Sequence, residues 1–292
     1  MIISHKIAAL TATLTTALSL LAAPAMAFSV GATNNAEILK NNLLGANTAG
    51  LSNFSVSTTG NSAAFGTFTN DPFGLKSGVV LSTGRVADIP GQNRKDNFTT
   101  QDSDLSTDFG PKGEKGDVTQ LNLSFFANST VEKLFFQYVF ASEEFPEFGG
   151  SKYNDDFELL LNGINLAKLS DGKTVTINNL VPDPHNRSKD HPDYIDNPSL
   201  TGIAANIVKL DGFTKVLGFE GLLKKNQTNV LSIRIKDVGD GKLDSAVFIK
   251  GGSVGTVQPE PVPEPMTVGG LMAGGAMLAA GRKLRNRRVG SN

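Results

Sequence analysis

The sequence contains no cysteine and no tryptophan, and it has only three tyrosines in 292 residues. The lack of cysteine excludes disulfide bonds, thiolate chemistry and zinc sites built on cysteine ligands. Stability must therefore come from a hydrophobic core, with or without a bound metal ion. The lack of tryptophan and the shortage of tyrosine weaken a carbohydrate-binding function, which draws on large aromatic side chains.

Positive charge is scarce in the central part of the chain. Lys6 and five basic residues near the C-terminus account for six of the 27 Lys and Arg, which leaves 21 against 27 acidic residues between positions 28 and 263. This central part carries a net charge of about −6, whereas proteins that bind phosphate backbones need clustered Lys and Arg. Nucleic acid is therefore excluded as an expected partner.

The first 27 residues have the pattern of a secretory signal peptide. Residues 1–6 are polar and carry one lysine, residues 7–21 are apolar, and Ala25-Met26-Ala27 places small residues where a signal peptidase reads them. The apolar run is shorter than the roughly 20 residues that cross a bilayer, which argues against a permanent anchor. We therefore expect signal peptidase to cleave after this triplet and the remaining chain to be exported.

Residues 28–254 consist of short segments separated by Gly, Asn, Asp and Pro, a pattern typical of antiparallel β-structure. Apolar and polar residues alternate over 121–125 and 231–235, which indicates strands with one buried face. Residues 134–141 and 157–161 are more continuously apolar, as expected of strands covered on both faces. Further strands are predicted over residues 63–68, 78–82, 174–178, 203–209, 216–222 and 245–249. The predicted fold is all-β, a single jelly-roll-like antiparallel sandwich.

One short helix is expected before the strands, over residues 34–45. Asn34 is the predicted N-cap, Glu37 lies three residues on as in a capping box, and Gly45 suits the left-handed position at the C-terminal end. The predicted inner face of this helix consists of Ile38, Leu39 and Leu43.

The pattern at the end of the chain indicates a linker followed by a membrane helix. Residues 255–265 are rich in proline and are expected to be extended. Residues 266–292 hold an apolar, glycine-rich stretch and a basic cluster, which together suit a short transmembrane helix with its basic end in the cytoplasm. The basic cluster consists of Arg282, Lys283, Arg285, Arg287 and Arg288. The sequence thus predicts four parts: signal peptide, domain, linker and membrane tail.

The linker, apolar stretch and basic cluster together resemble the PEP-CTERM sorting signal that bacterial exosortases recognise. The motif itself consists of Val262, Pro263, Glu264 and Pro265. The resemblance implies transient membrane anchorage, processing by an exosortase near the Pro-Glu-Pro segment, and delivery to the cell surface or matrix, often with exopolysaccharide. The chain departs from the pattern in having a short apolar stretch interrupted by four glycines.

Several motifs within the body of the chain resemble the choice-of-anchor L domain. They are LSTG at 81–84, FQYVFASEEFPEF at 136–148, YND at 153–155, DGFT at 211–214, IKDVGD at 235–240 and DSAVF at 244–248. The resemblance spans most of residues 34–254 and implies an extracellular domain that carries alternative surface anchors. No defined reaction comes with it, so it predicts location rather than activity.

Acidic residues mark the ends of three predicted strands, and they are the predicted metal ligands. Carboxylates gathered at one edge of a sandwich repel one another unless a cation lies among them, and oxygen ligands of this kind suit calcium. No D-x-D-x-D-G loop is present, and solvated turn residues are the alternative interpretation. The predicted calcium ligands are Glu143, Glu144, Glu147, Asn154, Asp155, Asp237, Asp240 and Asp244.

Other kinds of site have less support. A polysaccharide hydrolase would need paired carboxylates, but neighbours such as Glu143 and Glu144 point to opposite faces of a strand. His185 and His191 lie in the long loop 181–198 and could ligate zinc, although exposed loop histidines are the expected interpretation. Tyr153 and Tyr194 could stack on a sugar or pack against the rim of the sandwich. We therefore expect an exported structural, adhesive or ligand-binding protein with no catalytic residues, and an extracellular hydrolase is the alternative.

Overall fold

The computed structural model describes residues 27–95, 103–110 and 117–262. Most of the predicted signal peptide and the whole predicted membrane tail lie outside these residues, and so do Pro263, Glu264 and Pro265. Within the described ranges, no helix is both long enough and apolar enough to cross a membrane.

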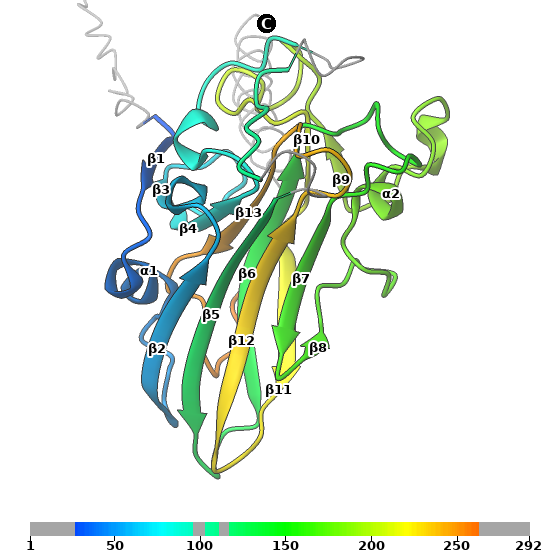
Figure 1. The fold of residues 1–292 in the computed structure, drawn as a ribbon. Coiled ribbons are helices and arrows are strands. Elements are labelled where there is room, and N and C mark those ends of the chain that lie inside the picture. The colour runs from blue at the N-terminus through cyan, green and yellow to red at the C-terminus, as the bar shows by residue number, and fades with distance from the viewer. Residues whose placement is uncertain (1–26, 96–102, 111–116, 263–292) are drawn as a thin grey trace, which may run out of the picture.

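Two antiparallel sheets form the domain and pack face to face (Figure 1). The larger sheet has the order β1-β3-β4-β13-β6-β10-β9, and β11 also pairs with β6. Its strands are β1 (Ser29–Ala32), β3 (Phe65–Thr69), β4 (Ser77–Ser82), β6 (Lys133–Ser142), β9 (Tyr194–Asp196), β10 (Gly212–Thr214), β11 (Leu217–Leu222) and β13 (Ser245–Lys250). The smaller sheet has the order β2-β5-β12-β7-β8, with β2 (Leu51–Thr59), β5 (Val118–Ala127), β7 (Asp156–Leu161), β8 (Ile164–Asn165) and β12 (Gln227–Lys236). The predicted all-β antiparallel fold is confirmed.

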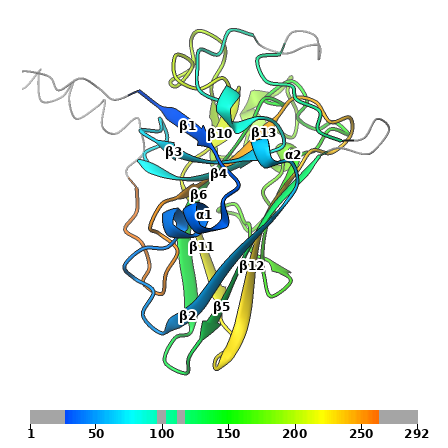
Figure 2. The same cartoon turned by 60° about the vertical axis from the view of Figure 1, so that its left-hand side comes forward.

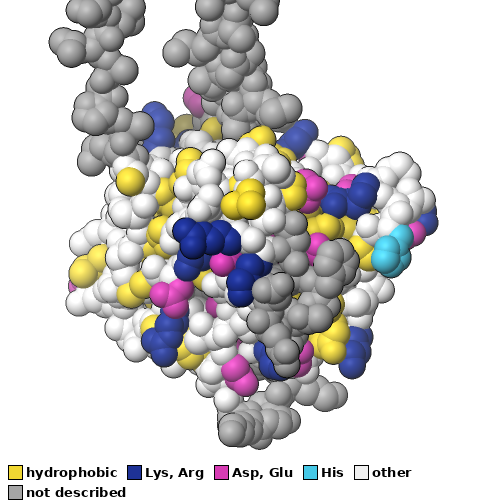
Figure 3. Space-filling view, turned by 90° about the horizontal axis from the view of Figure 1, so that it is seen from above, with side chains coloured by type: hydrophobic (Ala, Val, Ile, Leu, Met, Phe, Trp, Pro, Cys, Tyr) yellow, Lys and Arg dark blue, Asp and Glu magenta, His cyan; other side chains and the backbone are white. Residues whose placement is uncertain are grey.

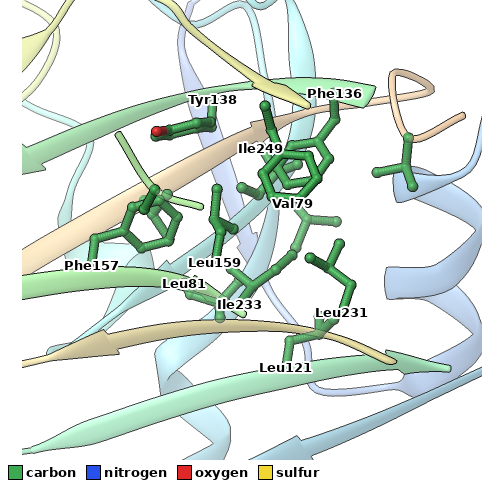
Figure 4. Packing of buried hydrophobic residues seen from close by; sticks show 14 of the residues in the cluster. Val79, Leu81, Leu121, Phe136, Tyr138, Phe157, Leu159, Leu231, Ile233 and Ile249 are labelled. Atoms are coloured by element: carbon green, nitrogen blue, oxygen red, sulfur yellow. The ribbon is translucent and has the colours of Figure 1, made fainter. Parts of the chain in front are cut away.

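Alternating residues of the smaller sheet build the main core between the sheets. Leu121 of β5 pairs with Ile233 of β12, and Leu123 pairs with Leu231; all four side chains are fully buried. They meet buried side chains of the larger sheet, among them Tyr138 (Figure 4). Each such aliphatic side chain contributes roughly 1.5–3 kcal/mol when it leaves water, so this interface holds the two sheets together.

The outer face of the larger sheet is also buried, which explains why β6 is continuously apolar. Val139 and Ala141 of β6 and Phe248 of β13 belong to a second core. Loop residues cover this face, and Leu105 and Val208 pack into the same core. The prediction for residues 134–141 is therefore confirmed, because loops on one side and a sheet on the other exclude water from both faces.

The helix α1 (Ala36–Leu43) lies beside β2 and β4 (Figure 2) and corrects part of the predicted helix. Its N-cap is Asn35, whose side chain accepts hydrogen bonds from the amides of residues 37 and 38. Leu39 and Leu43 are buried as predicted, but Ile38 is 45% exposed. The helix ends at Leu44 in extended backbone, so Gly45 does not take the left-handed position.

Three strand predictions were wrong in detail. Residues 157–161 form β7, but its burial alternates, so only one face is covered. Residues 174–178 contain isolated bridges and lead into α2 (Ile177–Leu180), because Thr176 caps a helical turn instead of continuing a strand. Residues 203–209 form turns, in which Ile203 and Ile207 are exposed.

Candidate functional site

Strands from both sheets end together under the loops at the top of Figure 1. In the larger sheet, Ser142 at the end of β6 pairs with Ser245 at the start of β13. In the smaller sheet, Asp156 at the start of β7 pairs with Lys236 at the end of β12. Each of these four ends is flanked by an acidic residue, namely Glu143, Asp155, Asp237 and Asp244. The pairing therefore brings the predicted acidic strand ends to one edge of the sandwich.

A serine bridge joins the two sheets at this edge. The Oγ of Ser245 donates to Oδ2 of Asp155 at 2.6 Å and lies 2.8 Å from the Oγ of Ser142. The other carboxylate oxygen of Asp155 accepts the backbone amide of Val238 at 2.8 Å. Asp155 is fully buried, so these two bonds satisfy both oxygens of a carboxylate that has no access to water.

Glu144, Asp155 and Asp237 form a buried acidic group at the centre of this edge, with half-buried Asp240 beside it. Burial raises the pKa of Glu144 to about 10, and the charges of Asp155, Asp237 and Asp240 add to the effect. The pKa of Asp237 is raised mainly by burial and next by the charge of Asp155. A hydrogen bond from the backbone amide of Gly241 lowers it and so opposes the shift. The pKa of Asp155 rises for the same main reason, burial.

Among the described residues, no cation of the protein offsets these charges. Glu144, Asp155 and Asp237 form no ion pair with Lys, Arg or His in that part of the chain. Glu144 is 2% exposed, and its Oε2 has no hydrogen-bond partner among the residues that the structure describes. An unpaired buried carboxylate is strongly unfavourable when ionised. The group must therefore hold protons or a bound cation.

A second set of carboxylates at this end binds the loop 103–110 instead. Glu143 Oε1 accepts the backbone amides of Asp104 at 2.6 Å and Leu105 at 3.1 Å. Asp244 Oδ1 accepts the amide of Thr107 at 2.9 Å, and Asp117 Oδ2 accepts that of Phe109 at 2.7 Å. Glu143 and Asp244, two of the predicted calcium ligands, thus hold the loop that covers the acidic group.

The remaining predicted ligands lie at the margin of this region. Asn154 Oδ1 accepts the amide of Asn178 at 2.8 Å and so supports α2. Glu147 is half-buried in the turn after the cis Phe145–Pro146 peptide bond. Across the described ranges, no three Asp, Glu or His side chains are grouped closely enough to hold a metal ion as they stand. The structure thus gathers the predicted residues at one edge without forming a finished ligand shell.

Among the described residues, the predicted acids at this end do not form an acidic surface patch. Asp and Glu side chains lie scattered among Lys and Arg in the view from above (Figure 3). The reason is burial, because Glu143, Glu144, Asp155, Asp237 and Asp244 are all at most 2% exposed.

A family model for the Choice-of-anchor L domain matches residues 29–255. The chain belongs to this family. No curated protein and no solved structure matches it. Membership in this family indicates an exported, surface-associated protein.

Two glycine motifs of the Choice-of-anchor L domain have a structural explanation at this edge. A Cβ at Gly84, the last residue of LSTG, would collide with the carboxylate of Asp244. A Cβ at Gly212, in DGFT, would lie 2.6 Å from the ring and hydroxyl of Tyr194. Both glycines are required because a carboxylate or an aromatic ring occupies the space that a side chain would need.

Sequence reasoning missed several residues of this edge. Ser142 and Ser245 lie directly beside the predicted acids Glu143 and Asp244, and their position was the available signal, whereas Gly84 meets Asp244 only in the fold. Asp117 directly precedes β5, as Asp155 precedes β7. The search for acids at the ends of predicted strands would therefore have found Asp117 as well. Asp211 is also buried and accepts Nδ2 of Asn93 at 2.6 Å, which ties DGFT to the loop after residue 90.

The two loop histidines differ in exposure, and the loop residue Tyr194 packs against another aromatic ring. His185 is exposed as expected, but His191 is 7% exposed, and its Nδ1 accepts the amide of Asp193 at 3.1 Å. The expectation of an exposed histidine was therefore wrong for His191, which has a structural role in its loop. Tyr194 packs on Phe145 with ring centroids 4.8 Å apart, the packing that the sequence analysis gave as the alternative to sugar binding.

Proposed function

We propose that the chain is an exported protein of the cell surface or extracellular matrix, in which the Choice-of-anchor L domain has a structural, adhesive or ligand-binding role. Signal peptidase removes residues 1–27, and an exosortase-type enzyme processes the tail near Pro263-Glu264-Pro265. The tail helix holds the chain transiently in the membrane before it reaches the surface. Exopolysaccharide or other surface proteins are the partners outside the cell. The order of linker, apolar stretch and basic cluster supports this sorting route.

We also propose that a calcium ion binds at the edge of the sandwich where the acidic strand ends meet. The observation that carries it is the buried Oε2 of Glu144, which has no partner among the described residues and faces the charges of Asp155 and Asp237. Carboxylate and carbonyl oxygens suit calcium, which accepts six to eight ligands in flexible geometry. The bound ion would offset the repulsion within the acidic group and stabilise the loops that cover it.

Calcium binding at this edge requires a rearrangement of side chains, because the acids in the described ranges are not grouped as a finished ligand shell. Rotation of Glu144 toward Asp155 would add its oxygens to those of the strand ends, and backbone carbonyls or water would complete the set. Extracellular calcium modules of low rigidity bind with dissociation constants on the order of 10⁻⁴–10⁻³ M. We therefore expect an affinity in that range, which suits calcium levels outside the cell.

Neither of the two surface hollows found among the described residues supports the hydrolase alternative. It needs two carboxylates that face each other across an open cleft, with a spacing of roughly 5–9.5 Å. The two surface hollows described for this chain are each lined by one acid, Glu220 in one and Glu132 in the other. The role of the domain is accordingly proposed to be binding or structural.

Deleting residues 263–292 tests the sorting route. The intact chain should be found with the membrane or cell surface, and the truncated chain should be exported and released into the medium, because the deletion removes the proposed membrane helix. Fractionation of producing cells followed by immunoblotting measures the distribution. A chain that lacks residues 1–27 is the control and should stay in the cytosol. An identical distribution of the intact and truncated chains would contradict the proposed sorting.

A further inference from the structure

A hollow lies on the outer face of β6 and β11, at the lower end of the larger sheet. Phe135 and Gln137 of β6, Val216 and Gly218 line one side of it. The other side is lined by the segment 258–262, the end of the described chain. The proline-rich residues that the sequence predicts as an extended linker thus lie against the body of the domain.

Hydrogen bonds hold the chain to the domain both before and within this segment. Gly255 and Phe135 exchange two backbone hydrogen bonds, at 2.8 and 3.1 Å. The amide of Thr256 donates to the carbonyl of Asn47 at 2.7 Å. At the far end, Nε2 of Gln137 donates to the carbonyl of Glu260 at 2.8 Å.

Gln137 is positioned to recognise an extended carbonyl. The side chain is 6% exposed, and its Oε1 accepts Nζ of Lys250 at 2.7 Å. Because a lysine can only donate, this bond fixes the amide with Nε2 pointing toward the segment. Glu260 lies between Pro259 and Pro261, which have no N–H and favour the extended polyproline conformation. An aromatic-lined hollow with one oriented donor is a common way to bind such segments.

We propose that this face of β6 and β11 is a recognition site for an extended proline-rich segment, and that the segment bound there is the chain's own residues 256–262, which form the other wall of the hollow. The segment acts as a strap that fixes where the tail leaves the domain. No free linker separates the strap from the sorting motif, since Val262 belongs to both and Pro263 follows the anchored Glu260 by three residues, about 10 Å of extended chain.

The strap has a consequence for processing of the tail, and this part rests on the proposed function. An enzyme that cleaves near residues 263–265 must bind extended chain on both sides of the cut, so the strap has to leave the hollow first. Docking therefore slows cleavage, and the domain regulates release of its own tail.

The absence of native cysteine allows a direct test of the strap in the full-length chain. Gly218→Cys and Val262→Cys place thiols on opposite sides of the hollow, and a Cβ at Gly218 meets no atom within 4 Å. A bifunctional maleimide long enough to span the hollow should join the two thiols within one chain, detected by thiol counting and intact mass. The control pair Val230→Cys with Val262→Cys should not be joined, because Val230 lies on the exposed face of β12 in the other sheet.

Gln137→Glu tests the recognition itself. Glutamate keeps the shape and the contact with Lys250 but cannot donate to Glu260, so cross-linking should slow by roughly five-fold, the effect of one lost hydrogen bond. An absent cross-link in the parent pair would overturn the strap, and cross-linked dimers would overturn an occupant from the same chain.

In exporting cells, Gln137→Glu should speed removal of the tail by a similar factor. Unchanged processing despite slower cross-linking would overturn the regulatory role. A tail that is never processed would contradict the proposed function, whereas the strap itself would still be tested by the cross-link in the parent pair.

Discussion

Calcium at about 5 mM should raise the melting temperature of the purified domain, residues 28–262, by roughly 5–9 °C at pH 8. This range follows from a dissociation constant near 10⁻⁴ M, which gives about 2.3 kcal/mol of stabilisation by mass action. At pH 5 the shift should be close to zero, because calcium must displace protons from Glu144 and its neighbours against a proton concentration about 1,000 times higher than at pH 8. Differential scanning calorimetry at the two pH values measures the difference.

Without calcium, the same residues should make the domain less stable as pH rises. Burial raises the pKa of Glu144 to about 10 and moves those of Asp155 and Asp237 in the same direction. The folded state then binds more protons than the unfolded chain, so the free energy of unfolding decreases with rising pH. The stabilising contribution of these groups is complete below their pKa values in the unfolded chain, which are near 4. It is lost as pH rises through their pKa values in the folded domain. The loss is about 1.4 kcal/mol for each pH unit between the unfolded and folded pKa values of a group.

Glu144→Gln separates this account from a general effect of charge. The substitution keeps the shape and removes the need to take up a proton on folding at pH 8, so the calcium-free domain should melt higher than the parent at that pH. Its response to calcium should be lost. Glu132→Gln is the matched control, since Glu132 is exposed and pairs with Lys225, and it should leave both properties unchanged. An unaltered calcium response in Glu144→Gln would remove the proposed site.

Gly84→Ala should destabilise the domain by roughly 3 kcal/mol. The new methyl group would meet the carboxylate of Asp244, and that carboxylate cannot move without giving up the amide of Thr107. The loop 103–110 should loosen as a result. Urea unfolding gives the change in stability, and hydrogen exchange of the loop amides gives its local effect.

Gly218→Ala is the control for this glycine, because a Cβ there meets no atom within 4 Å and the residue is exposed on its strand. We expect a change between zero and a stabilisation of about 1 kcal/mol. If Gly84→Ala were equally well tolerated, the contact between LSTG and Asp244 would have no role in stability.

The parts of the fold with a clear pattern could be predicted from the sequence. β5 and β12 alternate strictly because one face is in the core, and β6 is mostly apolar and almost entirely buried because both of its faces are covered. β2 was missed, since it is a largely exposed strand with polar residues and a register shift between Ser52 and Ser55 that breaks its alternation. Residues 203–209 have a strand-like composition, but turns place Ala204 and Val208 in the core and leave Ile203 and Ile207 outside.

The site could be predicted as a group of residues but not in its contacts. Acids at strand ends follow from the sequence, and antiparallel pairing brings them to one edge. The sequence does not say which way each side chain turns: Glu143 faces the loop amides, whereas its neighbour Glu144 faces Asp155 and Asp237. The choice depends on a loop that is distant in sequence, and no local pattern encodes that packing.

The most direct test of the central claim is isothermal titration of the purified domain with calcium at pH 8. The account predicts one site per chain with a dissociation constant on the order of 10⁻⁴ M, release of protons on binding, and no heat in Glu144→Gln. The absence of heat in the parent domain at millimolar calcium would show that protons alone occupy the acidic group, and would contradict the account.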